Sequence, residues 1–170
     1  ASAIQDQVKY ASNAADVIIS TGGLGPTEDD LTTHAVASLF KRAVVFDPIA
    51  FAHIEAYYAQ AKRTMPEVNR KQAYFPEGAI RIDNHWGTAP GFALEANQCL
   101  QMYLPGVPKE MKAMFSKYVR PLLEERFDLA PHRLITFKTT GVGESTLQER
   151  IGPFSHEKII LSYRTKSPEN

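Results

Sequence analysis

A glycine-rich turn is the first feature of the sequence that could do chemistry. Residues 21–30 read TGGLGPTEDD, so Gly22, Gly23 and Gly25 stand close together between an apolar run and a helical pattern. Glycine lets the backbone turn sharply and approach a ligand, and the N–H groups at a helix start attract anions. The spacing matches neither a P-loop nor a complete dinucleotide fingerprint. The turn predicts a phosphate site of another kind, with a purely structural turn as the alternative.

Three carboxylates follow the glycines directly, at Glu28, Asp29 and Asp30. Together they would repel a phosphate unless a divalent metal or sugar hydroxyl groups lay between. Mg²⁺ is commonly held by one or two carboxylates together with phosphate oxygens of the substrate. We expect Asp30, beside Leu31, to point inward and to act at the site. Glu28 is expected only to face solvent and to favour the helix dipole.

A basic, amide-rich segment lies further along the chain. The run Asn69–Gln72 places two cations and two amides next to one another on a predicted short helix at 67–75. Such groups can grip a phosphate and the edge of a base or sugar. The alternative is an ordinary solvated helix face.

Two loops complete the set of candidate segments. Residues 84–92, NHWGTAPGF, form a long irregular polar stretch that is typical of a ligand-facing loop. Trp86 in this loop could stack on a base or serve as a packing contact. Residues 104–108, LPGVP, end a predicted strand and begin a helix. In a parallel sheet they would share the carboxyl edge with the glycine turn, where ligands of open α/β sheets bind.

Strands and helices are spaced along the chain as an α/β fold requires. Residues 16–21 contain a short, continuous, β-branched run, typical of a strand buried in a parallel sheet. A helix is predicted to follow from Glu28, with the acidic residues in its first turn. Further strands are predicted at 79–82, 92–95 and 100–104, and further helices begin at Pro48 and at Pro108, the latter kinked at Pro121.

The helix that begins at Pro48 carries a histidine on its predicted apolar side. Ile49, His53, Ala56 and Tyr57 share one face at helical spacing. We expect His53 to pack within that face. No pair of histidines in the sequence has the spacing of a zinc protease.

The composition of the chain changes after residue 128. Residues 134–140 alternate, 143–151 read as a helix and 158–163 as a strand, which indicates the start of a small β-α-β unit. At the other end, a helix is predicted over residues 4–15, so the sequence opens inside a helical pattern and without a Met. We expect residues 1–128 to form one α/β domain, 129–170 to form part of a second, and the chain to be a fragment.

The overall composition argues against several classes of protein. The chain has 19 basic and 19 acidic residues, and a formal net charge of zero lacks the field with which most nucleic-acid binders neutralise phosphates. No apolar run approaches the roughly 20 residues that span a bilayer. Cys99 is the only cysteine, so no internal disulfide can form. The sequence predicts a cytoplasmic protein with neither nucleic acid nor membrane as partner.

Several motifs together carry a family resemblance. The segments GGLGPTEDDLT, NRKQA, GTAPGF and LPGVPKEM occur in this order, followed by GVGES and YRTK with PEN. In this the chain resembles the CinA-like, competence- and damage-inducible proteins. The resemblance implies a MogA/MoaB-like molybdopterin-binding fold, a three-layer α/β/α sandwich with a mostly parallel sheet. It further implies a partial KH-like subdomain over residues 129–170, a first strand that this chain lacks, and a homodimer in the intact protein.

The function that the resemblance implies is hydrolysis of a small nucleotide. With a divalent metal, Mg, Mn or Co, ADP-ribose or a related nucleoside diphosphate sugar would be split to AMP and ribose 5-phosphate. The implied catalytic residues are Asp30 and Lys71, and the implied metal ligands are Asp30 and Asp29. The implied substrate-binding residues are Gly22, Gly23, Gly25, Thr27, Asn69, Arg70, Asn84, Thr88, Pro105 and Gly106.

Two other functions stay open from the sequence. The chain could be a module that binds molybdopterin or acts with the molybdenum cofactor, because MogA-like relatives share the glycine turn and the acidic position. It could also be a regulatory scaffold without catalysis. The chain departs from the family at His85 and Trp86, where relatives more often have a Pro and a small apolar residue. The rim of the site is therefore expected to differ there.

Overall fold

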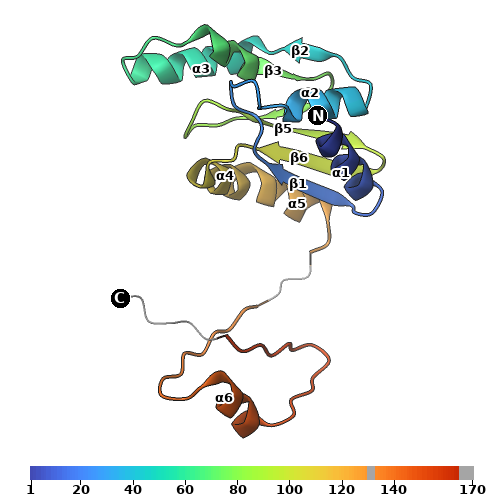
Figure 1. The fold of residues 1–170 in the computed structure, drawn as a ribbon, viewed down its shortest axis with the longest axis vertical. Helices are drawn as coiled ribbons and strands as arrows, with labels where there is room; N and C mark the ends of the chain where they lie inside the picture. The colour runs from blue at the N-terminus through green and yellow to red at the C-terminus, as the bar shows by residue number, and fades with distance from the viewer. Residues whose placement is uncertain (130–132, 165–170) are drawn as a thin grey trace. The chain divides into compact units, whose positions relative to one another are not determined.

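The computed structural model describes residues 1–129 and 133–164 of the chain (Figure 1). The chain divides into two units, Ala1–Leu129 and a second that begins at Ala130, and each is described by itself. No helix in the described ranges is both long and apolar enough to cross a membrane.

The first unit is built around a sheet of four strands. These lie in the order β1 (Val17–Thr21), β6 (Cys99–Leu104), β5 (Gly91–Ala96) and β4 (Ile80–Ile82). Strands β1 and β6 are parallel, whereas β5 runs antiparallel to both of its neighbours. The expected α/β class is confirmed, but the sheet is mixed and not mostly parallel. The cause is the short connection at Asn97 and Gln98, whose positive φ angles of 55° and 62° form a tight hairpin.

Helices cover both faces of this sheet, as Figure 1 shows. On one face, Val8 of α1 (Ser2–Ser12) and Val36 of α2 (Thr32–Leu39) pack with Phe92 and Tyr103 of the sheet. On the other face, Met114 packs with every second side chain of β6, namely Leu100, Met102 and Leu104. The inward side chains of β6 alternate between the two clusters, as a strand between two helix layers requires. The three-layer arrangement is confirmed.

Helix α3 (Pro48–Gln60) presents a different face to the core than the sequence predicts. The side chain of Asp47 caps its start by accepting hydrogen bonds from two backbone N–H groups. Ala50 and Ile54 are buried, whereas the side chain of His53 is 47% exposed. The prediction that His53 packs was wrong, because the stripe through Ala50 and Ile54 turns inward instead.

A small second sheet and a short helix lie beside α3. Strand β2 (Val44–Phe46) pairs antiparallel with β3 (Tyr74–Pro76). The predicted short helix is a 3₁₀ helix, η1 (Glu67–Ala73), and it leads directly into β3. This order fixes the Asn69–Gln72 run between α3 and the small sheet.

The last helix of the first unit is interrupted before Pro121. Helix α4 (Pro108–Met114) continues into a π-helical segment, η2 (Phe115–Val119), and then into α5 (Arg120–Arg126). Proline has no N–H to donate and its ring crowds the preceding turn. The predicted irregularity is therefore present, and it takes the form of a wider turn.

The second unit contains one helix, α6 (Glu144–Ile151), among the residues that the structure describes, and this helix was predicted. The strands predicted at 134–140 and 158–163 are not formed. Leu134, Phe137 and Ile160 are 89%, 86% and 95% exposed. A strand needs a partner strand and a surface that buries one of its faces, and these segments have neither in the described part of the unit. The KH-like arrangement stays a prediction.

Candidate functional site

The register of β1 against β6 brings two predicted segments together. Thr21 lies opposite Leu104, and the N–H of Gly22 donates to the carbonyl oxygen of Leu104 at 2.9 Å. A Cβ on Gly106 would lie 3.3 Å from the Cα of Gly22. The two turns therefore touch, and the expected common carboxyl edge is confirmed.

A cavity of about 350 Å³ opens at this edge, and we call it the phosphate cavity after the ligand that the sequence predicts there. The predicted site residues that line it are Gly22, Gly23, Gly25, Asp30, Thr88, Pro105 and Gly106. Its other lining residues are Leu24, Pro26, Gln72, Ala89, Val107 and Glu110. Neither Lys nor Arg is in this lining.

The glycine turn contributes residues with free backbone N–H groups to the cavity lining. The φ angles of Gly22 and Gly23 are +98° and +71°, values that residues other than glycine rarely adopt. Within the described ranges, the N–H groups of Gly23, Leu24 and Gly25 donate to no acceptor of the chain. Successive free N–H groups in such a turn form a concave site for an anion.

Helix α2 begins later than predicted, which changes the origin of this site. Its first residue is Thr32, so the three acidic residues lie in the preceding loop and outside the first helical turn. The N–H of Thr32 already donates to the carbonyl of Gly23 at 3.1 Å, and its hydroxyl donates to that of Gly22 at 3.0 Å. The predicted anion site would therefore be formed by the loop backbone and would not depend on a helix end.

The acidic residues first hold the loop itself. The N–H and hydroxyl of Thr27 donate to Oδ2 of Asp30 at 3.0 and 2.7 Å, and the hydroxyl also donates to Asp29. The bond from Thr27 lowers the pKa of Asp29 below its ordinary value. The Lys71 ammonium group donates to the carbonyl of Thr27. Asp29, Thr27 and Lys71 thus support the loop from outside the cavity lining, and Asp30 both supports the loop and lines the cavity.

The Asn69–Gln72 run contributes one residue to the cavity. Asn69 is only 3% exposed, and its Nδ2 donates to the Tyr58 hydroxyl at 2.8 Å. The Arg70 guanidinium stacks over the Phe46 ring, 4.5 Å from its centroid. Gln72 is the member of this run that lines the cavity. The structure does not bring Asn69 or Arg70 to the predicted site.

Asn84 does not line the phosphate cavity but bonds to two residues that do. Its Nδ2 donates to the carbonyl of Ala89 at 2.9 Å and to Oε2 of Glu110 at 2.7 Å, and its Oδ1 accepts from the N–H of Trp86. Gly87 lies so close to α4 that a Cβ there would be 2.2 Å from the Glu110 carboxylate. These contacts hold the loop between β4 and β5 against the start of α4.

Glu110 is the functional candidate that the sequence reasoning missed. It stands in the first turn of α4, far from the glycine turn in sequence, and lines the same cavity. The available signal was the motif LPGVPKEM, in which the carboxylate stands at the helix start that directly follows the cavity residues Pro105 and Gly106.

Two carboxylates, Asp30 and Glu110, line the cavity. Across residues 1–129 and 133–164, no group of three or more His, Cys, Asp or Glu side chains could hold a metal ion. A metal held by the chain alone therefore does not fit. An ion completed by phosphate oxygens and water fits better, because Mg²⁺ is usually bound with only one or two carboxylates.

Comparisons with known proteins agree with this architecture. Residues 1–125 match the family described as "Probable molybdopterin binding domain". A CinA-like protein of Shewanella woodyi is 42% identical over 162 residues, which cover 94% of this chain and 38% of that protein. A protein from Geobacillus sp. (strain WCH70) carries the name competence-damage inducible protein. It is 45% identical over 151 residues, which cover 87% of this chain and 36% of that protein.

A solved structure supports the same assignment. The crystal structure of the protein CinA from Thermoplasma acidophilum superposes with a TM-score of 0.63 at 34% identity, over 70% of this chain and 69% of that one. The chain thus spans little more than a third of the curated relatives cited above. It belongs to the molybdopterin-binding-domain family and, within that family, to the CinA-like proteins.

Proposed function

We propose that the phosphate cavity binds the diphosphate of a nucleoside diphosphate sugar, with ADP-ribose as the first candidate. In the intact protein, hydrolysis would yield AMP and ribose 5-phosphate. The observation that carries the proposal is that Gly23, Leu24 and Gly25, whose N–H groups donate to no acceptor of the described chain, line a cavity together with two carboxylates. Neutral N–H donors bind phosphate oxygens, while the carboxylates call for a positive charge between them and the ligand.

A divalent cation would supply that charge, since the cavity lining has no Lys or Arg. Asp30 and Glu110 would hold the ion together with the substrate. When bound, such an ion neutralises phosphate charge and makes a bound water more acidic. This chain's own groups would orient the phosphates through the Gly23–Gly25 backbone and fix the Glu110 carboxylate through Asn84.

The reaction itself would be a displacement at phosphorus. A water oxygen adds to one phosphorus atom, the bridging P–O bond breaks, and the proton of the water passes to a carboxylate. We assign that proton to Glu110, because Oδ2 of Asp30 already accepts two hydrogen bonds from Thr27. Lys71 takes a supporting role in this proposal, since its ammonium group is bound to the Thr27 carbonyl.

Binding of molybdopterin is the second candidate function. The observation that favours it is the match of residues 1–125 to a molybdopterin-binding family. Molybdopterin also carries a phosphate, so the same row of N–H groups would hold it. The two candidates differ in whether the ligand brings one phosphate or two, and hence in how much they depend on a divalent cation.

Calorimetry with ADP-ribose tests the leading proposal. With Mg²⁺ or Mn²⁺ present, we expect binding that a chelator weakens at least about tenfold, equivalent to about 1.4 kcal/mol. Asp30→Asn and Glu110→Gln should each produce a similar loss with the metal present. Glu124→Gln is the matched control, because this carboxylate is exposed on α5 and pairs with Arg120 at 3.7 Å.

Four outcomes are informative about the candidates. Equal affinity with and without chelator would remove the metal from the proposal. Loss of binding in Glu124→Gln as well would show a general effect of charge. Release of AMP from ADP-ribose, followed with a chain of the relatives' full length, would establish the hydrolysis. Metal-dependent binding without AMP release would favour a binding or regulatory module.

A further inference from the structure

A second cavity lies beside α3, and none of the assignments above uses it. Its volume is about 400 Å³, and it is lined by His53, Ala56, Tyr57, Gln60, Asn84 and His85. The first four stand at positions i, i+3, i+4 and i+7 of one helix, so they form a single face of α3. This face is the one that the core leaves exposed. We call the space the histidine cavity.

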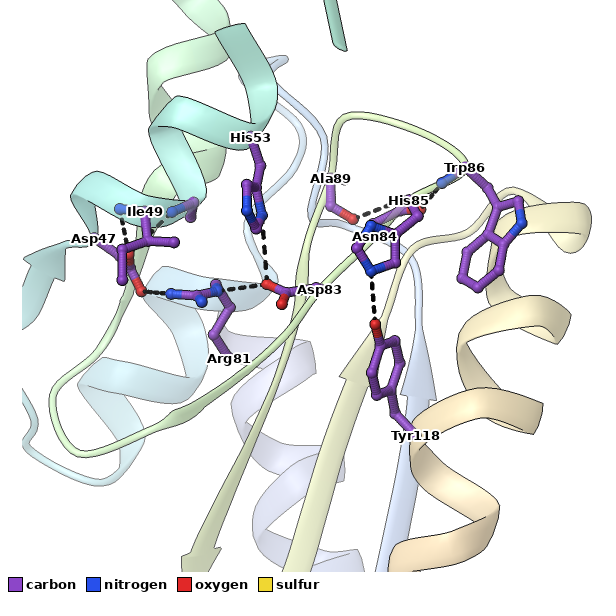
Figure 2. Close-up of polar contacts among 11 residues, drawn as sticks. Asp47, Ile49, His53, Arg81, Asp83, Asn84, His85, Trp86, Ala89 and Tyr118 are labelled. Carbon is purple, nitrogen blue, oxygen red and sulfur yellow. Dashed lines mark hydrogen bonds and ion pairs between the residues drawn. The ribbon is translucent and has the colours of Figure 1, made fainter. Parts of the chain in front are cut away.

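Polar contacts fix the His53 side of this cavity (Figure 2). Nδ1 of His53 lies 3.6 Å from Oδ1 of Asp83, and the same oxygen accepts from Nε of Arg81 at 2.6 Å. The Arg81 guanidinium also donates to Asp47 at 2.6 Å, and Asp47 caps α3. Burial alone would raise the pKa of Asp47, but the Ala50 N–H and Arg81 outweigh it and lower that pKa. The two carboxylates outnumber the single guanidinium, so Arg81 is not an unpaired cation beside His53.

The second imidazole is held independently of the first. Nε2 of His85 lies 2.8 Å from the Tyr118 hydroxyl, which comes from the π-helical segment η2 (Figure 2). The ring centroids of His53 and His85 are 6.4 Å apart. Trp86 packs its edge on His85 and lies near Lys117, and it does not line the cavity. His85, and not the predicted Trp86, is thus the stacking group that faces the space.

The chemistry of this lining selects against ions. It contains neither Lys, Arg nor a carboxylate, which disfavours a phosphate. The described residues hold no cluster of metal-ligating side chains that could bind a cation. The lining does contain three flat π systems and the carboxamide of Gln60, whereas both N–H groups of the Asn84 amide already donate within the chain. Rings of this kind stack on a planar heterocycle, and amides bond to its edge.

The two cavities are joined through one side chain. Asn84 lines the histidine cavity, and its Nδ2 donates to Ala89 and to Glu110, which both line the phosphate cavity. We propose that the histidine cavity binds the base of a nucleotide whose phosphates occupy the phosphate cavity. The inference rests on the proposed function and adds the part of the ligand that determines its class. The histidine cavity would recognise the nucleoside end of the ligand and not its sugar-phosphate end.

Nuclear magnetic resonance of the histidine rings tests this proposal. The chain has five histidines, and His156 in the second unit serves as an internal control. AMP should shift the His53 and His85 ring signals and leave that of His156 unchanged, because a stacked base adds a ring current. Ribose 5-phosphate at equal saturation should leave the rings of His53 and His85 almost unchanged.

Variants then separate base recognition from phosphate binding. Tyr57→Ala and His85→Ala should each weaken AMP by at least about fivefold, the usual minimum for loss of a stacked ring, and leave ribose 5-phosphate affinity unchanged. Tyr118→Phe keeps both rings and removes only the hydroxyl, so it should cost less than His85→Ala. Tyr10→Ala, at a tyrosine that is 74% exposed on α1, is the matched control.

The outcomes distinguish failure of this inference from failure of the proposed function. AMP binding without shifts at His53 and His85, or equal losses for AMP and ribose 5-phosphate in the variants, would overturn the base site. If ribose 5-phosphate and ADP-ribose do not bind at all, the proposed function fails. Adenosine alone then decides, since shifts at His53 and His85 would uphold a nucleoside site and their absence would reject it.

Discussion

Two regions of the first unit carry the residues that the sequence assigned to phosphate, and they differ in what they offer. The glycine turn at residues 22–26 lines the phosphate cavity with its backbone. In the Asn69–Gln72 run, Asn69 is buried against Tyr58 and Arg70 lies on an aromatic ring. The first region keeps three successive backbone N–H groups free, whereas most polar side chains of the second are already bonded or packed within the fold.

The difference follows from which atoms carry the chemistry. In the glycine turn they are N–H groups, whose position depends on the β1 and β6 register and on the φ angles of Gly22 and Gly23. In the Asn69–Gln72 run they are side-chain atoms, whose orientation depends on neighbours distant in sequence. A backbone site can therefore be located from a motif, while a side-chain site requires the packing around it.

Gly23→Ala should break the cradle and has the largest expected effect. A Cβ at this position would lie 2.1 Å from Oγ1 of Thr32, at a φ of +71°. We expect loss of detectable ADP-ribose binding and a fall of about 2–3 kcal/mol in the free energy of unfolding, within the usual range for backbone strain. Urea unfolding followed by the fluorescence of Trp86, the single tryptophan, measures this change in the first unit.

Gly22→Ala is the control for backbone strain without a clash. Its φ is +98°, but a Cβ there would meet nothing within 4 Å. The stability loss should be about 1–2 kcal/mol, the cost of a left-handed residue with a side chain. Equal losses of stability in the two variants would show that the clash of the added Cβ with Thr32 costs nothing beyond the backbone strain.

Asn69→Ala should affect stability and leave binding intact. The substitution removes the donor that reaches Tyr58 and the one that reaches Oε1 of Gln72 at 3.2 Å. A buried polar group without its partner costs about 1–3 kcal/mol. We expect that loss in the free energy of unfolding measured in urea. The ADP-ribose affinity of the folded protein should change by less than about twofold. A large loss of affinity at unchanged stability would restore Asn69 to the binding site.

Arg70→Ala should have a smaller effect of the same kind. Its guanidinium lies 4.5 Å from the Phe46 centroid and 5.0 Å from that of Phe51, while the residue is exposed. Cation–π contacts at exposed sites contribute about 0.5–1 kcal/mol. Arg70→Lys tests the planar stacking, and Arg63→Ala serves as the control for loss of one exposed charge. Weaker ADP-ribose binding in Arg70→Ala alone would contradict the packing role.

The strands and the carboxyl edge of the sheet could be predicted because they depend on local patterns. The run at residues 17–21 and the motif LPGVP fix where β1 and β6 end, and their pairing follows from the α/β class. His53 was misplaced because α3 is apolar on more than one side, so periodicity did not select the buried stripe. Glu110 was missed because one carboxylate in a helical first turn is ordinary, and only the contact with Asn84 sets it apart.

Thr27→Val should have the smallest effect, and it tests how the acidic loop is held. The Thr27 hydroxyl is the largest cause of the lowered pKa of Asp29, whose ordinary value is 3.8. A carboxylate with a lowered pKa stabilises the folded loop above its ordinary pKa, and that contribution is lost as the pH falls through the lowered value. In Thr27→Val the Asp29 pKa should rise toward 3.8, measured by carboxyl ¹³C titration, while Thr64→Val leaves it unchanged. Because Asp29 does not line the cavity and the Thr27 N–H still donates to Oδ2 of Asp30 in the variant, ADP-ribose affinity at neutral pH should change by no more than about twofold. An unchanged Asp29 titration would mean that the loop is held by Asp30 and Lys71 alone.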